Sequence, residues 1–169
     1  MSEFILKLSN ISKSFGGVKV LENVSFDVEK GSRHALIGPN GAGKTTLFNV
    51  ISGIHDPEKG TVYFKGKDLR GVPSRKRIHR GLSRSFQNIR LMPHLSVLEN
   101  VMLGQHSRIN FVDMFKPLDF LSKSSGKGEA IETLKSFGID LHKGQTVSSL
   151  PYGIRKKIEV VRALMAKPS

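Results

Sequence analysis

The sequence contains no cysteine among its 169 residues. This absence excludes disulfide bonds and any thiolate metal site, and it suits a reducing compartment. Long apolar runs are also missing, so we expect no segment to cross a bilayer. The chain starts Met-Ser-Glu-Phe, without a basic stretch leading into an apolar one, so we expect no secretory signal there. Any function at a membrane would therefore depend on a partner.

Acidic side chains are scarce, with 14 Asp and Glu against 27 Lys and Arg, which gives a net charge of +13. Most of the excess lies in residues 61–110, a stretch that carries ten basic and two acidic side chains. It could form a surface for nucleic acid or anionic lipid headgroups, or a solvated face balanced by a partner. We favour the second interpretation and expect no nucleic-acid partner, because no aromatic residues interleave with the basic ones. The stretch includes Arg70, Arg75, Lys76, Arg77, Arg80, Arg84 and Arg90.

Histidine clusters are absent as well. The six histidines form no pair at helical spacing, so we assign none of them to a metal. They are His34, His55, His79, His94, His106 and His142.

The most informative feature that is present is a glycine-rich run of the form G-x-x-x-x-G-K-T. Such a loop turns its backbone N–H groups toward phosphate oxygens, its lysine reaches the β- and γ-phosphates, and its first threonine can ligate Mg²⁺. The context supports this interpretation, because we expect a strand at Arg33–Ile37 before the loop and a helix at Thr45–Ser52 after it. The sequence therefore predicts binding of a nucleotide with Mg²⁺ by Gly38, Pro39, Asn40, Gly41, Ala42, Gly43, Lys44, Thr45 and Thr46.

Other elements follow from periodicity and from start and stop signals. Alternating apolar residues predict strands, which cover Phe4–Leu8, Val24–Val28, Thr61–Phe64 and, further on, Leu82–Phe86. Helical patterns cover 74–80, 97–105 and 129–137, the second opened by a capping box of Ser96 and Glu99. A last helix follows Leu150–Gly153, with the apolar positions Ile154, Ile158, Val161, Leu164 and Met165.

Three motifs in order resemble the ATP-binding subunits of ATP-binding-cassette (ABC) transporters. Phe15 lies in a glycine turn before the phosphate loop, Gln87 opens a loop after an expected strand, and Leu150-Pro151-Tyr152-Gly153 begins a helix. The run from Leu82 to Leu91, followed by Leu95–Asn100, is similar to the ATPases of branched-chain amino acid importers. The resemblance extends from about Phe4 to the last residue.

The resemblance implies an α/β fold: the core of a P-loop NTPase with an antiparallel β subdomain and a helical subdomain. We expect one partial nucleotide-binding domain, 1–169, with the core in 1–92 and the helical subdomain with the signature helix in 93–169. The family's C-terminal part would then be missing, and with it the Asp that anchors Mg²⁺ and the Glu that serves as general base. Asp140 and Glu159 do not replace them, because neither follows an apolar strand.

The resemblance also implies individual roles. Phe15 would stack on adenine. Lys44 and Gln87 would be the catalytic residues that this chain carries, and Thr45 and Gln87 would be the metal ligands. Leu150, Pro151, Tyr152 and Gly153 would meet the γ-phosphate held by the opposite subunit of a head-to-tail dimer.

The signature departs from the family pattern at two positions. Pro151 and Ile154 stand where the family usually has serine and glutamine, which removes a hydroxyl contact in trans and weakens this signature.

The implied function is ATP hydrolysis that drives import of branched-chain amino acids, at the cytoplasmic face of the membrane. The implied partners are permease subunits, a second ATP-binding subunit and, indirectly, a periplasmic or extracellular substrate-binding protein. For this chain alone we expect weak nucleotide binding and little turnover. Two alternatives stay open: a binding-only or regulatory nucleotide module, and an ABC protein of nucleic-acid metabolism.

Overall fold

The computed structural model describes residues 4–85, 90–108, 125–140 and 145–169. The chain divides into two compact units, Met1–Arg77 and Ile78–Ser169. The first unit carries the phosphate loop, and the second carries the segment Leu150–Gly153.

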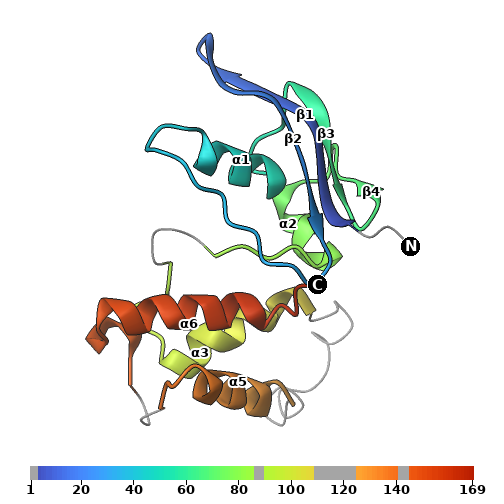
Figure 1. The fold of residues 1–169 in the computed structure, drawn as a ribbon. Helices are drawn as coiled ribbons and strands as arrows, with labels where there is room; N and C mark the ends of the chain where they lie inside the picture. The colour runs from blue at the N-terminus through green and yellow to red at the C-terminus, as the bar shows by residue number, and fades with distance from the viewer. Residues whose placement is uncertain (1–3, 86–89, 109–124, 141–144) are drawn as a thin grey trace. The chain divides into compact units, whose positions relative to one another are not determined.

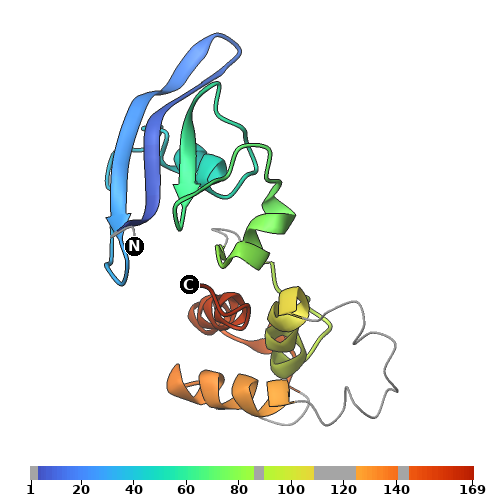
Figure 2. The same cartoon turned by 90° about the vertical axis from the view of Figure 1, so that its right-hand side faces the viewer.

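The first unit contains a four-stranded antiparallel sheet in the order β2-β1-β3-β4 (Figures 1 and 2). Its strands are β1 Phe4–Phe15, β2 Val18–Glu29, β3 Lys59–Phe64 and β4 Lys67–Asp68. Gly16 and Gly17 close the β1–β2 hairpin, both with positive φ, as a tight two-residue turn requires. Three of the four strands expected in this region are therefore confirmed, and β1 and β2 are longer than predicted.

Helix α1, Lys44–Ile51, confirms the predicted helix after the phosphate loop and packs beside β2 (Figure 1), and its residues Leu47 and Val50 are buried. It ends in a Schellman motif: Gly53 N–H donates to the Val50 carbonyl, and Ile54 N–H donates to the Asn49 carbonyl. Gly53 adopts φ +73°, which is the left-handed conformation this motif needs.

The predicted strand Arg33–Ile37 is wrong, because these residues have no regular structure and Ile37 is 89% exposed. A strand needs a neighbour to accept and donate its backbone hydrogen bonds, and none of the described strands pairs with this segment. The predicted strand at Leu82–Phe86 is also not formed over Leu82–Ser85, and Phe86 lies outside the described residues. In both places an apolar sequence pattern is not sufficient to form a strand without a neighbouring strand to pair with.

The helix predicted over residues 74–80 forms as α2, Ser74–Arg77, and continues as the 3₁₀ turn η1, Ile78–Arg80. The second unit contains three α-helices in its described part, α3 Val97–Met102, α5 Ser125–Ser136 and α6 Tyr152–Leu164. Two further 3₁₀ segments are η2 Leu103–Arg108 and η4 Val147–Ser149. All predicted helices are therefore present, although α3 becomes 3₁₀ after Met102 and α5 starts at Ser125.

The capping box at the start of α3 forms as predicted. Glu99 N–H donates to the Ser96 hydroxyl, and the Glu99 carboxylate accepts from Ser96 N–H at 2.8 Å. The hydrogen bonds from the Ser96 hydroxyl and backbone hold the pKa of the Glu99 carboxyl below its ordinary value. The capping box thus fixes the start of α3, the first helix after Gln87 in the sequence.

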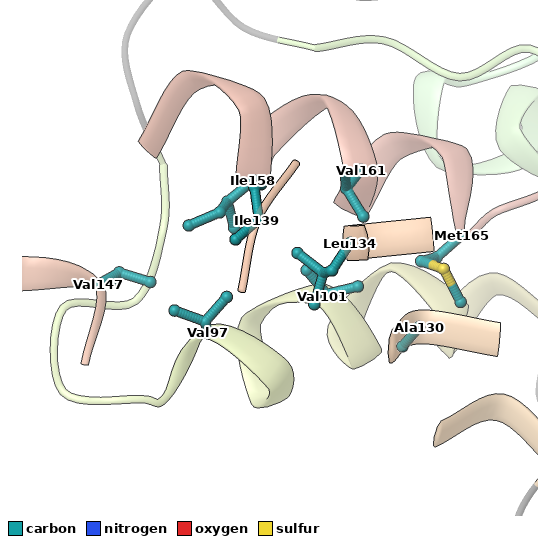
Figure 3. Packing of buried hydrophobic residues seen from close by; sticks show 9 residues of the cluster. All are labelled: Val97, Val101, Ala130, Leu134, Ile139, Val147, Ile158, Val161 and Met165. Atoms are coloured by element: carbon teal, nitrogen blue, oxygen red, sulfur yellow. The ribbon is translucent and has the colours of Figure 1, made fainter. Parts of the chain in front are cut away.

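Helices α3, α5 and α6 pack around one apolar cluster (Figure 3). It consists of Val97, Val101, Ala130, Leu134, Ile139, Val147, Ile158, Val161 and Met165. The predicted apolar positions of α6 agree with this core, except that Leu164 is exposed. Burial of these side chains stabilises the helical unit by about 1.5–3 kcal/mol for each large residue.

Candidate nucleotide-binding site

The phosphate loop is shaped by glycines in a backbone conformation that other residues rarely adopt. Gly41 and Gly43 have φ +84° and +80°, in the left-handed region. A Cβ on Gly43 would lie 2.8 Å from the Val20 carbonyl and 3.0 Å from the Leu21 side chain. The loop therefore packs directly on β2, and Gly43 is required both for its φ and for the space.

Lys44 is the first residue of α1, and its ammonium folds back over the loop. Its Nζ donates to the carbonyls of Gly38 at 2.5 Å and Pro39 at 2.6 Å. An ammonium has three donors, so these two bonds leave one that can reach a phosphate oxygen. The lysine charge is thus held against the first two carbonyls of the loop.

The start of α1 favours an anion. Gly43 is its N-cap and makes no side-chain capping bond, and the first turn contains no acidic residue. The N–H groups there carry the positive end of the helix dipole, which attracts phosphate. Thr45 is exposed in this turn and Thr46 is half-buried, so Thr45 is available to bind a nucleotide-associated cation.

Phe15 lies at the end of β1 and is 42% exposed. Its ring meets the His55 ring edge-on at a centroid distance of 5.2 Å, and Lys13 Nζ lies 5.4 Å from its centroid. The preceding residue is held by Glu58, whose carboxylate accepts from Ser14 N–H at 3.0 Å and from its hydroxyl at 3.1 Å. The aromatic ring is therefore accessible and mounted on a fixed backbone, as stacking on a base requires.

The segment Leu150–Gly153 exposes the start of α6. Pro151 is the N-cap, and its carbonyl accepts from Arg155 N–H at 3.1 Å, without a side-chain cap. Tyr152 is 61% exposed and Gly153 is exposed, whereas Leu150 packs against the core cluster. Leu150 therefore has a packing environment, and the following residues are the ones that can meet a ligand.

The predicted site residues do not all fall in one unit. The phosphate loop and Phe15 belong to Met1–Arg77, and the segment Leu150–Gly153 belongs to Ile78–Ser169. Gln87, predicted as a catalytic residue and metal ligand, lies outside the described residues. Within the described part of the chain, no group of three His, Asp or Glu side chains could hold a metal ion.

The sequence analysis did not predict the burial of three charged or amide side chains. Arg77, taken as part of a basic face, is only 3% exposed and donates to four backbone carbonyls, so a solvated role is wrong for this residue. Asn100 and Glu159 are also buried. One signal was available for Glu159: it stands between Ile158 and Val161 on the apolar face of α6, with basic residues three positions away on either side.

The glycine loop, its lysine and the adjoining helix have the arrangement that characterises the P-loop class of proteins. The family model described as ABC transporter matches residues 21–169. The chain belongs to this family.

Several curated proteins are similar to the chain over nearly its whole length. It is 32% identical to the high-affinity branched-chain amino acid transport ATP-binding protein BraF of Pseudomonas aeruginosa, covering 99% of this chain and 68% of that protein. It is 31% identical, with the same coverage, to LivG of Escherichia coli, which carries the same description. The ribose import ATP-binding protein RbsA of Caldanaerobacter subterraneus is 36% identical, covering 96% of this chain and 32% of that protein.

Solved structures agree with these relatives. The ADP conformation of an ATP-binding cassette of an ABC transporter is 33% identical, with a TM-score of 0.81, and the match covers 99% of this chain and 66% of that one. A nucleotide-free ATP-binding cassette is similar at a TM-score of 0.80 and 33% identity, covering 98% and 66%. The predicted fold class is therefore confirmed, and the chain spans about two thirds of the length of these cassettes.

Proposed function

We propose that the chain is the ATP-binding part of an ABC importer and binds Mg²⁺-ATP through the loop Gly38–Thr46. The observation that carries the proposal is the placement of the Lys44 ammonium over the loop carbonyls at the start of α1. In this assignment the loop N–H groups and Lys44 hold the β- and γ-phosphates, Thr45 ligates Mg²⁺, and Phe15 stacks on adenine. Gln87 completes the Mg²⁺ shell and orients water, a role taken from the family motif.

The segment Pro151–Gly153 serves a second subunit in this proposal. In a head-to-tail dimer, the uncapped start of α6 would face the γ-phosphate bound by the partner subunit. Lys156 follows one turn later, with its Nζ 5.7 Å from the Tyr152 ring centroid and 3.5 Å from the Glu159 carboxylate. Pro151 offers neither hydroxyl nor N–H, so the anion would be held by later N–H groups of the helix.

Branched-chain amino acids are the proposed substrate class, because BraF and LivG match the chain over its whole length. Sugar import is the second candidate, supported by the identity to a ribose import protein. Reconstituted permeases of each type, supplied with the corresponding full-length ATPase, can distinguish them. We expect the chain to compete for the amino acid permease, and competition for the sugar permease alone would reverse the assignment.

The proposed location is the cytoplasmic face of the membrane, against permease subunits that receive substrate from a binding protein. None of the helices in the described ranges is long and apolar enough to cross a bilayer.

We further propose that the 169-residue chain hydrolyses ATP very slowly. No Asp-Glu pair occurs anywhere in its sequence, so the family's general base and Mg²⁺ anchor have no counterpart. Phosphate release should stay at the level of a Lys44→Ala variant, while ATP photolabelling of the wild type, competed by unlabelled Mg²⁺-ATP, should exceed that of the variant. Turnover at an enzymatic rate that Lys44→Ala abolishes would contradict the low-turnover proposal, and equal labelling of both proteins would contradict nucleotide binding at the loop.

A further inference from the structure

The backbone of Arg90 is held on both sides by one helix of the second unit. Glu159 of α6 accepts a hydrogen bond from Arg90 N–H at 3.2 Å, and Arg162 Nη1 donates to the Arg90 carbonyl at 2.7 Å. Glu159 and Arg162 lie one turn apart on α6, so they act on the two sides of a single residue. Both contacts are to the main chain, which makes them independent of the side chain at position 90.

Glu159 is 2% exposed, which a carboxylate tolerates only with partners. Its oxygens lie 3.5 Å from Lys156 Nζ and 3.8 Å from Arg162 Nη2. The two positive charges and the Arg90 N–H together compensate the buried negative charge of the Glu159 carboxylate. If the Arg90 segment left α6, the buried oxygen would lose a donor, which is costly in an apolar environment.

A second buried polar side chain holds the same segment from α3. Asn100, with 0% exposure, accepts from Met92 N–H at 2.7 Å. Its amide nitrogen donates to the carbonyls of Met92 and Ser96, each at 3.0 Å. Both polar ends of the Asn100 amide are therefore occupied by the backbone between Arg90 and the start of α3.

We propose that Glu159 and Asn100 are positioning residues that fasten the segment 90–96 to α6 and α3, so that this segment moves with the helical unit as one piece. The contacts stand by themselves, whereas their functional significance rests on the proposed function. Arg90 comes three residues after Gln87, and α6 begins at the signature segment. The contacts of segment 90–96 with α6 would therefore connect the region of Gln87, with its proposed role at the nucleotide, to the helix that would serve the partner subunit.

Backbone amide exchange of the whole chain, measured by NMR without nucleotide, tests the fastening directly. We expect the Arg90 and Met92 amides to be protected in the wild type. In Glu159→Ala the Arg90 amide should exchange at least about tenfold faster, while Val101 and Val161 in the core stay unchanged. Glu159→Gln keeps an oxygen acceptor, so its Arg90 amide should stay within about threefold of the wild type.

Three results would overturn the proposal: an unprotected Arg90 amide in the wild type, no effect of Glu159→Ala, or an effect of Glu159→Gln as large as that of Glu159→Ala. If Glu159→Ala also accelerates the exchange of the core amides, Arg162→Ala is the variant to measure instead. This substitution removes the bond to the Arg90 carbonyl at a partly exposed residue. It should accelerate Arg90 exchange with the core unchanged, and unchanged Arg90 exchange would overturn the proposal.

Addition of saturating Mg²⁺-ATP tests the link separately. Exchange at Arg90 and in the first turn of α6 should change together in the wild type, and Glu159→Ala should uncouple them. If ATP binds and the two regions respond independently, the link is wrong. If ATP does not bind, the proposed function fails, whereas the nucleotide-free exchange data still decide the fastening.

Discussion

Single residues of the phosphate loop are constrained in two ways, by backbone conformation and by space. Gly43 meets both constraints, with φ +80° and with Val20 and Leu21 of β2 where a side chain would begin. Gly41 has a similar φ but open space around it, so it is constrained by conformation alone. The loop geometry that aims N–H groups at phosphate therefore depends most on Gly43.

Gly43→Ala should lower the affinity for Mg²⁺-ATP by at least about tenfold, because the loop must leave β2 to admit a methyl group. Gly128→Ala is the matched control, since Gly128 lies within α5 with nothing near its missing Cβ. The control should bind nucleotide normally and gain up to about 1 kcal/mol of stability. Titration of both variants with a fluorescent ATP analogue measures the difference, and equal affinities would refute the role of Gly43.

Phe15 supplies the other residue-level prediction. Phe15→Ala should weaken ATP binding by about 5- to 150-fold, the range that corresponds to a stacking free energy of about 1–3 kcal/mol per base. Phe15→Tyr retains a ring at this exposed position and should bind like the wild type. The assay should use ATP and inorganic triphosphate, because only ATP carries a base. A loss that is the same for both ligands would show that Phe15 acts on the loop and not on adenine.

The connection between elements in the first unit depends on Arg77 of α2. Its guanidinium donates to the carbonyls of Val50 at 2.9 Å and Ile51 at 2.7 Å, at the end of α1. It also donates to Leu69 at 3.1 Å and to Val72 at 2.8 Å. A Cβ on Gly53 would lie 2.5 Å from Arg77 Nε, so the glycine that ends α1 also makes room for the arginine.

Arg77→Met should destabilise the chain by about 2–4 kcal/mol, because it leaves several buried carbonyls without a donor. Arg75→Met changes an exposed neighbour on the same short helix and should stay within about 0.5 kcal/mol of the wild type. Urea denaturation followed by circular dichroism compares the two free energies of unfolding. If both substitutions cost the same small amount, the buried arginine does not hold α1 in place.

At the scale of elements, the sequence predicted what local signals specify. The Ser96–Glu99 capping box, the helix after Lys44 and the apolar face of α6 are each encoded by residues a few positions apart, and each is present. The strand expected at Arg33–Ile37 was wrong, because a strand also needs a hydrogen-bonding neighbour that periodicity does not supply. The burial of Arg77 could not be predicted either, since its carbonyl partners Val50 and Ile51 lie 27 and 26 residues away in the sequence.

In the candidate site too, local sequence signals could locate some residues and not others. The phosphate loop could be located from its spacing, because glycine conformation and the lysine at the helix start are local properties. Phe15 needed the order of motifs, since an isolated aromatic residue is more often part of a core. Glu159 was considered only as a substitute for a general base, whereas its contacts place it in the packing of the helical unit.

At the scale of the whole molecule, the loop and the signature segment belong to two different compact units. A chain that binds ATP with one unit and offers the other to a partner subunit would be incomplete for turnover as a monomer. This arrangement is consistent with nucleotide binding without appreciable hydrolysis. Nucleotide binding by the phosphate loop is therefore the property to measure first.

Isothermal titration of the whole chain with Mg²⁺-ATP, Mg²⁺-ADP and AMP is the most direct test, with Lys44→Ala as the site variant and Lys30→Ala as an exposed control. We predict saturable binding of ATP and ADP at one site per chain, much weaker binding of AMP, and at least about a tenfold loss in Lys44→Ala alone, about 1.4 kcal/mol or more. Equal affinity for AMP and ATP, or full affinity in Lys44→Ala, would contradict phosphate recognition by this loop.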